Sequence, residues 1–314
     1  MPVPHRPVEG AIVSAVDQMI LVEQENLAKI SEDVAEHLHI YLICRRPRIA
    51  IVPSEFRADE ARRQIVFTAQ HGETFERIEV QGPPAFGAAD LELQSEWPYG
   101  DFTVVEPDGE RLAWGRSSLW LTREAFGNKH LNLEVLYVGQ AYGTEGRRNA
   151  VDRLSKHETL QAIYAEAVRR SPDKEVWIVL LGLAEPYGLI LFSPVPGDDP
   201  EFAETVTRLT TPISEQQRIN FTEAALIRYF QPPYNTDYKD TFPSPAHKTY
   251  RECYKMDVNS VAFEMETSEP IQTRLYSEAV PPSWWHIKDF PLHSPAERRS
   301  LFDFSRDDDP VAPQ

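Results

Sequence analysis

The sequence predicts an α+β fold, because segments with helix-like spacing of apolar residues occur together with many short β-branched runs. Its 314 residues are enough for about two domains, and a composition of 41% hydrophobic and 26% charged residues is typical of a globular protein with a sizeable core. We expect three parts: an N-terminal module of mixed helix and strand over residues 1–115, a central domain over 116–240, and a C-terminal extension over 241–314.

The N-terminal module begins with helix-like spacing and continues with strands. From Gly10 to Leu38, apolar residues recur at helical intervals, which predicts one or two packing helices. A break before Ser31 would allow this serine to cap the second helix. Six later runs are typical of strands: Ile40–Ile43, Ile49–Val52, Gln64–Thr68, Phe75–Val80, Phe102–Val105 and Arg111–Trp114. No pattern in the module indicates a chemistry, so whether it is the functional unit of the chain stays open.

The central domain is predicted to contain two buried strands and two helices. The β-branched run Val135–Val138 ends at Gly139, where the backbone can turn sharply. An amphipathic helix is expected over Ala150–Arg170, and it is followed by a continuous apolar run, Val176–Leu183, that is typical of a central strand. A second helix is expected over Glu215–Tyr229, because two prolines stop it shortly afterwards.

Two further segments lie outside this core pattern. Residues 185–212 are richer in proline and acid than a compact domain needs, so we interpret them as an insertion. In the C-terminal extension, strands are expected over Tyr250–Glu266 and Ile271–Ser277, a short helix over Pro295–Phe304, and an acidic tail from Asp307 onward.

The central domain also concentrates side chains that can cleave a phosphodiester. Arg153 and His157 are four residues apart on the expected first helix, so both can point at one object. Tyr137 lies on the preceding strand, Glu223 inside the second helix, and Asn235 just past the end of that helix. A carboxylate can hold a divalent metal, an arginine can neutralise phosphate oxygens, and a phenol or imidazole can take the proton of an attacking water. Together these residues predict a site for phosphodiester hydrolysis.

Each of these residues also has a purely structural interpretation. Tyr137 could be an ordinary strand aromatic, and Arg153 could pair with a neighbouring acid on a solvated helix face. Glu223 fits a capping box with Asn220, but the Ser-x-x-Gln pattern that begins at Ser214 fits the same role earlier and makes a more natural helix start. One shared catalytic cause explains all the positions at once, so we prefer it.

The order and spacing of these positions resembles the GIY-YIG nuclease superfamily over about residues 117–240. Tyr137-Val-Gly139 is similar to its YIG element, and Arg153 with His157 is similar to its helix Arg-x-x-x-His. Glu223 and Asn235 are similar to its metal-binding glutamate and to the asparagine of its closing Pro-x-Asn. The resemblance implies a small three-stranded antiparallel sheet flanked by helices. It also implies hydrolysis of nucleic-acid phosphodiesters, with DNA as the expected substrate, by one Mg²⁺ or Mn²⁺ ion held by Glu223, leaving 5′-phosphate and 3′-hydroxyl ends.

One element of the family is missing from its expected place. The family begins with a Gly-Ile-Tyr strand, and the closest segment upstream of Tyr137, Ser118-Leu-Trp120, carries an indole instead of the phenol. An indole N–H donates a hydrogen bond but cannot accept a proton. We therefore expect Tyr137 or His157 to activate the water. The alternative is a catalytically impaired domain of the same fold that acts in nucleic-acid or protein binding.

The net charge of −17 argues against a general nucleic-acid binder, which usually has a basic surface. Residues 116–240 carry 14 basic and 17 acidic residues, a net of −3, so most of the acidity lies in the flanking parts. Because salt screens charges beyond about 8 Å, distant acids need not repel a phosphate near the site. The basic residues expected to bind this phosphate, beside Arg153, are Arg147, Arg148 and Lys156. We expect the substrate to be found through a protein partner, a special nucleic-acid structure or a narrow local site, and a homo-oligomer stays open.

Two further observations bear on the setting of the protein. Only two cysteines are present, Cys44 and Cys253, and they fall in different segments, so neither a disulfide framework nor a structural zinc site is expected. The N-terminus lacks the pattern of a signal peptide, and no apolar stretch approaches the roughly 20 residues of a membrane span. We expect a cytoplasmic protein without membrane contact.

Overall fold

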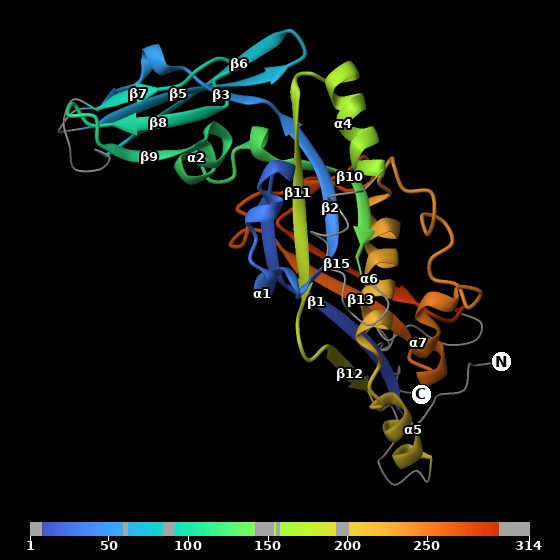
Figure 1. The fold of residues 1–314 in the computed structure, drawn as a ribbon. Coiled ribbons are helices and arrows are strands. Elements are labelled where there is room, and N and C mark those ends of the chain that lie inside the picture. The colour runs from blue at the N-terminus through green and yellow to red at the C-terminus, as the bar shows by residue number, and fades with distance from the viewer. Residues whose placement is uncertain are drawn as a thin grey trace, which may run out of the picture.

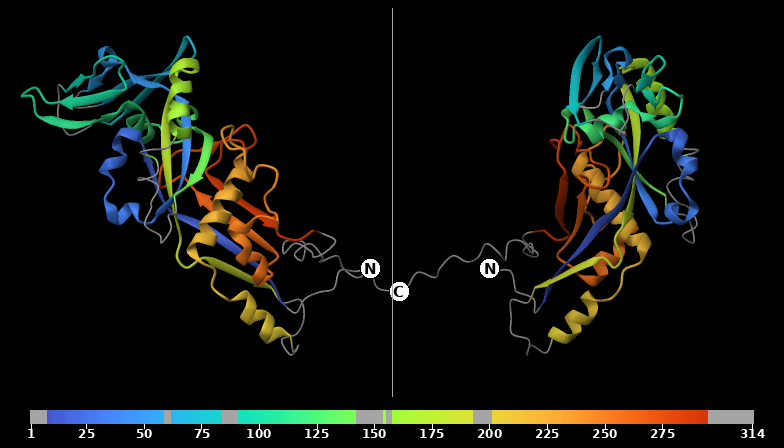
Figure 2. Two further views of the ribbon diagram at one scale, coloured as in Figure 1. Left: turned by 45° about the vertical axis from the view of Figure 1, so that its right-hand side comes forward. Right: turned by 90° about the vertical axis from the view of Figure 1, so that its left-hand side faces the viewer.

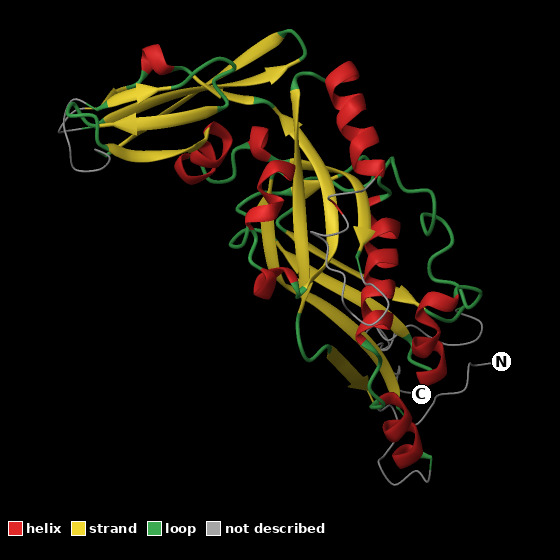
Figure 3. Cartoon of the chain, viewed as in Figure 1, coloured by secondary structure: helices red, strands yellow, loops and turns green. Residues whose placement is uncertain are grey.

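The computed structural model describes residues 8–58, 62–83, 91–141, 154, 158–192 and 201–294. Within these ranges the chain is an α+β protein, as predicted. A large mixed sheet carries helices on both faces, and a smaller β-rich lobe lies at one end of it (Figures 1 and 3). Two further views show the lobe projecting from the end of the sheet (Figure 2).

The large sheet has eight strands, three of which form an antiparallel unit. In spatial order the path is β14 (Leu275–Tyr276), β10 (Leu133–Gln140), β2 (Leu38–Pro47), β11 (Lys174–Leu183), β1 (Glu9–Val22), β13 (Ser260–Glu266) and β15 (Trp285–Pro291), with β12 (Gly188–Phe192) paired to β1 off this path. Strand β2 is antiparallel to β10 on one side and to β11 on the other. The long β1 pairs with β11 through its second half and with β12 and β13 through its first half, so it joins the two halves of the sheet.

Helices cover both faces of the antiparallel unit. Since side chains alternate across a strand, Leu42 on β2 faces one side of the sheet and Tyr41 faces the other. Leu42 belongs to a buried cluster with residues of α6 (Glu215–Phe230), whereas Tyr41 belongs to a cluster with Leu160 of α4 (Glu158–Arg170). The shorter helical segments outside the lobe are η1 (Gln24–Lys29), α1 (Glu32–Ala35), α5 (Phe202–Leu209), η5 (Lys248–Tyr250) and α7 (Arg251–Met256).

Helix α6 begins and ends where the sequence predicts. The side chain of Ser214 caps its first turn by accepting a hydrogen bond of 3.4 Å from the Gln217 backbone N–H. At the other end, Gln231 adopts the left-handed conformation with φ of 51°, and the prolines that follow cannot continue the helix. Glu223 lies in the middle of the helix, so the capping-box interpretation of this residue does not apply.

The β-rich lobe, residues 48–131, is inserted between β2 and β10. Its four-stranded sheet contains β3 (Ile49–Ile51), β5 (Arg63–His71), β4 (Arg57–Ala58) and β6 (Thr74–Gly82), and its three-stranded sheet contains β7 (Glu92–Gln94), β8 (Asp101–Val105) and β9 (Arg111–Arg116). Three helical segments complete it: η2 (Pro53–Glu55), α2 (Ser117–Glu124) and η3 (Lys129–Leu131). Trp120 of α2 lies in the lobe core, where its ring stacks on Phe102 with centroids 4.1 Å apart. Trp120 is therefore a packing residue of the lobe, and the expectation that it stands in the place of the first tyrosine is wrong.

Buried charges join the lobe to the large sheet. Arg46, at the end of β2, is buried; it donates to Glu175 at 2.7 Å, and its guanidinium carbon lies 4.4 Å from the centre of the Trp177 ring. Arg116, at the end of β9, forms ion pairs with Glu23 at 3.1 Å and with Glu175 at 3.6 Å. Burial raises the pKa of Glu23 to about 7, against the opposing effect of Arg116. Removing one of these charges would leave its partner buried without compensation.

The prediction of helices over residues 10–38 is wrong for its first half. Residues 9–22 form strand β1, and only the short η1 and α1 follow before β2. The first half of β1 is paired along both edges and needs apolar side chains on both faces, so its sequence lacks the strict alternation of a half-buried strand. The spacing of Ile12, Val16 and Ile20 therefore fits a helix as well as a buried strand.

Other predicted boundaries are confirmed in part. Strands β2, β3, β5, β6, β8, β9, β10 and β11 match the predicted runs. The sheet does not follow the expected division at residue 115, because β1 and β2 share it with β10 and β11, and β13, β14 and β15 from the C-terminal part complete it. The expected insertion at 185–212 contributes β12 and α5, and residues 250–256 are helical before β13 begins. The predicted helix over Pro295–Phe304 and the acidic tail lie outside the described residues.

A buried histidine on β15 gives the stability of the protein a defined pH dependence. The Nδ1 atom of His286 lies 3.2 Å from the Tyr229 hydroxyl and its Nε2 atom 3.1 Å from the Ser283 carbonyl, which fits a neutral ring that accepts at Nδ1 and donates at Nε2. Burial lowers the pKa of His286 from 6.5 to about 4. The unfolded chain therefore takes up the proton first as the pH falls. The free energy of unfolding should drop by about 3 kcal/mol between about pH 7 and pH 4.

Urea unfolding at several pH values across this range checks the expectation. A His286→Gln variant cannot titrate at this position, so it should be less stable near neutral pH but should lose about 3 kcal/mol less than wild type on acidification. The exposed His37 supplies the control, and His37→Gln should keep the acid loss of the wild type. Equal acid losses in wild type and His286→Gln would contradict the prediction.

Candidate active site

Two tyrosines lie on one face of the antiparallel unit, one of them directly opposite a glycine. In the pairing of β2 with β10, Tyr41 is opposite Gly139 and Ile43 is opposite Tyr137. Positions 41 and 43 share one face of the sheet, so both phenols lie on the side covered by α4. The two rings are 6.1 Å apart between centroids, with an angle of 34° between their planes.

Gly139 makes this approach possible. A Cβ atom at this position would lie 2.5 Å from the Tyr41 hydroxyl oxygen and 2.7 Å from the Tyr137 Cε1 atom. Any side chain at position 139 would therefore displace both phenols. The sequence suggested a turn at this glycine, but β10 continues through it to Gln140. Gly139 is needed because it leaves space for the Tyr41 and Tyr137 side chains, and not because the backbone changes direction there.

Tyr41 is a site residue that the sequence analysis missed. It belongs to His39-Ile40-Tyr41 on β2, and the whole lobe separates it from Tyr137 along the chain. The run that contains it is predicted correctly as a strand, but its pairing partner lies beyond residue 131. The Ile-Tyr dipeptide at the start of a buried strand was the signal that could have identified it.

Asn235 fixes the backbone of β10 between the positions of Tyr137 and Gly139. Its Oδ1 atom accepts a hydrogen bond of 2.9 Å from the Val138 N–H, and its Nδ2 atom donates one of 2.8 Å to the Val138 carbonyl. The neighbouring Tyr234 N–H donates to the carbonyl of residue 136 at 3.1 Å. The segment after α6 thus pairs with the edge of β10 that β2 does not use, and the buried amide satisfies a donor and an acceptor there.

Glu223 lies half-buried on α6, the helix that packs against the other face of the antiparallel unit. One turn earlier on this helix, Asn220 Oδ1 accepts a hydrogen bond of 2.9 Å from Gln140 Nε2 at the end of β10. Residues three apart on a helix share one side, so Glu223 lies on the side of α6 that faces this end of β10. The same end of the strand is where Gly139 meets Tyr41.

A histidine and a second carboxylate lie at the same end of the sheet. His39 Nε2, at the start of β2, is 3.3 Å from Glu215 Oε1 at the start of α6, and the His39 carbonyl accepts from the Ala141 N–H at 2.8 Å. Burial lowers the pKa of His39, and the Glu215 carboxylate opposes this effect. An imidazole two residues from Tyr41 can exchange protons at this end of the sheet. The sequence analysis did not find it either.

Five predicted residues lie outside the described part of the chain: Arg147, Arg148, Arg153, Lys156 and His157. Leu154 is described, and it is buried in the same cluster as Tyr41. Of the predicted site residues that are described, Tyr137 lies on β10 next to Val138, to which Asn235 is hydrogen-bonded. Glu223 lies on α6, which covers the face of the sheet opposite the tyrosines, on the side of the helix near the end of β10. Tyr41 meets Tyr137 from β2.

The Glu223 carboxylate could take part in binding a metal ion. Among the described residues, groups of three side chains that could hold a metal occur only in the lobe: His71 with Glu76 and His130, and Glu106 with Asp108 and Glu110. Neither group includes Glu223. Mg²⁺ keeps several waters and is often bound through one or two carboxylates together with substrate phosphates. A glutamate outside any such group of three fits Mg²⁺ or the similar Mn²⁺ better than it fits a zinc cage.

The histidine group in the lobe is already satisfied by its own hydrogen bonds. His130 Nδ1 lies 3.0 Å from His71 Nε2, and His130 Nε2 lies 3.0 Å from Glu76 Oε1. The two nitrogens of one ring thus point at different partners, and Lys129 also contacts the glutamate at 3.1 Å. A metal ion would have to break this arrangement, so the group is explained as a packing network.

No family model, no curated protein and no solved structure matches this chain. Within the described residues, no helix is long and apolar enough to cross a membrane. The function is therefore inferred from the residues of the chain and their geometry alone.

Proposed function

We propose that this protein is a divalent-metal-dependent nuclease of the GIY-YIG type, which hydrolyses phosphodiester bonds in DNA. The observation that carries the proposal is the contact of Tyr41 with Tyr137 and Gly139 across two paired strands. In this proposal Tyr41 would take the role of the first tyrosine, which the motif lacked in the sequence. The antiparallel unit of β10, β2 and β11, with α4 and α6 on opposite faces, supports the small sandwich that the resemblance implies.

Each residue has a role in this proposal. A Mg²⁺ or Mn²⁺ ion held by Glu223 would supply Lewis-acid stabilisation of the phosphate oxygens. A phenol both donates and accepts hydrogen bonds, so the partly exposed Tyr137 can orient an attacking water and receive its proton, and the buried Tyr41 hydroxyl would assist in passing this proton on. Arg153 would neutralise charge on the phosphate, and His157 would assist in proton transfer. Asn235 positions the strand that carries Tyr137, through its two hydrogen bonds to Val138.

The remaining features of the proposal concern substrate binding and setting. Arg147, Arg148 and Lys156 would contact phosphates on either side of the scissile bond. A protein partner or a second copy of the chain would help an acidic protein to find DNA. The thiols of Cys44 and Cys253 are both buried and free, which suits the cytoplasmic setting that we propose.

The alternative of a catalytically impaired binding module rests on the missing first tyrosine and on the acidity of the chain. The pairing of Tyr41 with Gly139 supports the nuclease on the first point, and the net charge of −17 remains in favour of the alternative. A binding module would bind nucleic acid without a metal and would not cleave it. A single assay of binding and cleavage therefore distinguishes the binding module from the nuclease.

The test is a cleavage assay on supercoiled plasmid, single-stranded DNA and RNA, with Mg²⁺, with Mn²⁺ and with a chelator. Wild type should cleave DNA only with a divalent metal. Tyr41→Phe removes one hydroxyl group and nothing else, and it should slow cleavage by about 10²-fold, as expected for loss of a group that handles a proton.

Tyr164→Phe is the matched control, because Tyr164 packs against the same cluster from α4. It should cleave like wild type. If folded wild type cleaved none of the substrates with either metal, or if Tyr41→Phe cleaved as fast as the control, the proposed function would be wrong.

A further inference from the structure

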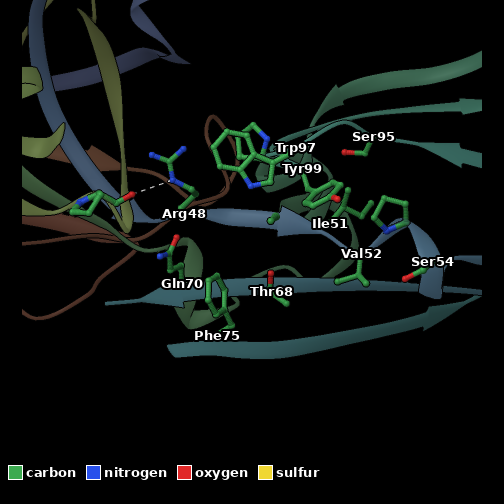
Figure 4. A pocket seen from close by; sticks show the side chains of 14 residues that line it. Arg48, Ile51, Val52, Ser54, Thr68, Gln70, Phe75, Ser95, Trp97 and Tyr99 are labelled. Atoms are coloured by element: carbon green, nitrogen blue, oxygen red, sulfur yellow. Dashed lines mark hydrogen bonds between the residues drawn. The ribbon is translucent and has the colours of Figure 1, made fainter. Parts of the chain in front are cut away.

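A second site lies at the base of the lobe, where the lobe meets the large sheet. It is a pocket of about 910 Å³, and its lining comes from β3, η2, β5, β6, the segment before β8, and the connection between α4 and β11. Arg48, which directly follows β2 after Pro47, lies at one end of the pocket, and its Nε donates to the Pro172 carbonyl at 3.2 Å (Figure 4). The pocket therefore belongs to both parts of the molecule.

Aromatic side chains stand on opposite sides of this pocket. Trp97 and Phe75 face it from its two sides, and Tyr99 lies beside Trp97 (Figure 4). The exposed fractions are 82% for Trp97, 62% for Phe75 and 39% for Tyr99. Three solvent-exposed aromatic side chains around one pocket are unusual for a surface without a ligand or partner. Two rings on opposite walls can hold a flat aromatic ligand between them.

The polar residues of the pocket indicate which ligand charge it favours. Gln70 lies near Arg48 at the same end, and Thr68 lies farther from Arg48, beyond Phe75 (Figure 4). Among the described residues that line the pocket, Arg48 carries the one charge and none is acidic, although the chain holds 49 acidic residues. A cation or a basic peptide would find no counter-charge here. An anionic or neutral flat ligand is favoured, with its negative group beside Arg48.

We propose that this pocket binds an unpaired nucleotide of single-stranded nucleic acid, with its base between Trp97 and Phe75 and its phosphate toward Arg48. The choice of ligand rests on the proposed nuclease function. Tyr41 and Arg48 are seven residues apart along one extended stretch of chain, which spans about 23 Å, so one substrate strand can reach both sites. Base stacking depends little on surface charge. It therefore offers a protein of net charge −17 a way to hold nucleic acid without a large basic face.

The experiment measures binding without cleavage. A fluorescein-labelled (dT)12 oligonucleotide is titrated with the full chain in a chelator, and fluorescence anisotropy gives the Kd. Trp97→Ala and Phe75→Ala should each weaken binding about tenfold or more, in line with the loss of one stacked base. Trp285→Ala is the control, since Trp285 on β15 is 59% exposed and does not line the pocket. Arg48→Gln should weaken binding and make it less dependent on salt.

Two comparisons separate this inference from the alternatives. Decaproline is the competing probe, because aromatic grooves also bind proline-rich segments. Binding of decaproline without (dT)12, or no binding of either, overturns the proposal, as does a Trp97→Ala variant that binds (dT)12 like Trp285→Ala. Failure of the nuclease proposal is seen separately, because cleavage is assayed with metal and binding without it. A chain that binds (dT)12 through Trp97 but never cleaves keeps this inference and overturns the nuclease.

Discussion

Replacing Glu223 by glutamine is expected to abolish metal-dependent cleavage, with a loss of about 10³-fold or more in rate. Glutamine keeps the size of the side chain and its place on α6 but removes the charge that a divalent cation requires. Loss of a metal ion removes several kcal/mol of transition-state stabilisation, and each 1.36 kcal/mol corresponds to about tenfold in rate. Because the described residues place no other metal-binding group of three side chains around Glu223, no neighbouring carboxylate cluster replaces it.

Plasmid nicking under single-turnover conditions, across a range of Mn²⁺ concentrations, measures this effect. Asp240→Asn is the control, because it removes a carboxylate whose side chain is 91% exposed. The control should cleave at the wild-type rate. Both variants should unfold at temperatures close to that of wild type, since neither removes a core side chain. Cleavage by Glu223→Gln at an undiminished rate would mean that the nuclease site lies elsewhere.

Replacing Gly139 by alanine is expected to damage both the fold and the activity. The added methyl would meet the Tyr41 hydroxyl oxygen at 2.5 Å and a carbon of Tyr137 at 2.7 Å. Tyr41 is fully buried between strands and α4, so it cannot swing into solvent to relieve the contact. Overpacking of this kind costs about 1–3 kcal/mol or more, and here the strain falls on the two phenols that are proposed to handle water.

Chemical denaturation and the cleavage assay together check this prediction. Gly82→Ala is the matched control on β6, because a methyl there would meet only the flexible end of Arg63, at 3.3 Å. The control should lose less than about 1 kcal/mol and keep full activity. A Gly139→Ala protein as stable and as active as the control would show that the close packing of the tyrosines is not needed.

The sequence was a good guide to local structure in the antiparallel unit. The runs that became β10 and β11 and the helix that became α6, with its Ser214 cap, follow from periodicity and capping chemistry, which act over a few residues. Strand β1 was predicted as a helix because a strand that is buried on both faces lacks the alternation of apolar and polar residues that marks a half-buried strand. The C-terminal strands β13 and β15 were not expected to join the same sheet, since nothing local specifies a distant pairing partner.

The candidate site was predictable to a lesser extent. Tyr137, Glu223 and Asn235 follow from the order of the motif, but the pairing of Tyr41 with Gly139 depends on register between strands that the lobe separates. Register is fixed by long-range packing, which a single sequence does not reveal. The same reason explains why His39 was missed, since its partner Glu215 lies at the start of α6, far along the chain.

The lobe enters and leaves the sheet at neighbouring points. Arg45 near the end of β2 pairs with Glu134 near the start of β10, so the two strands could be joined by an ordinary hairpin turn without moving either. Loop-closure entropy grows only with the logarithm of loop length, and the lobe has a hydrophobic core of its own. The lobe could therefore be exchanged over evolution without changing the pairing of β2 with β10, provided that the new lobe also compensates Glu23 and Glu175, which now pair with Arg116. The proposed active site could then be kept while the proposed nucleotide pocket varies.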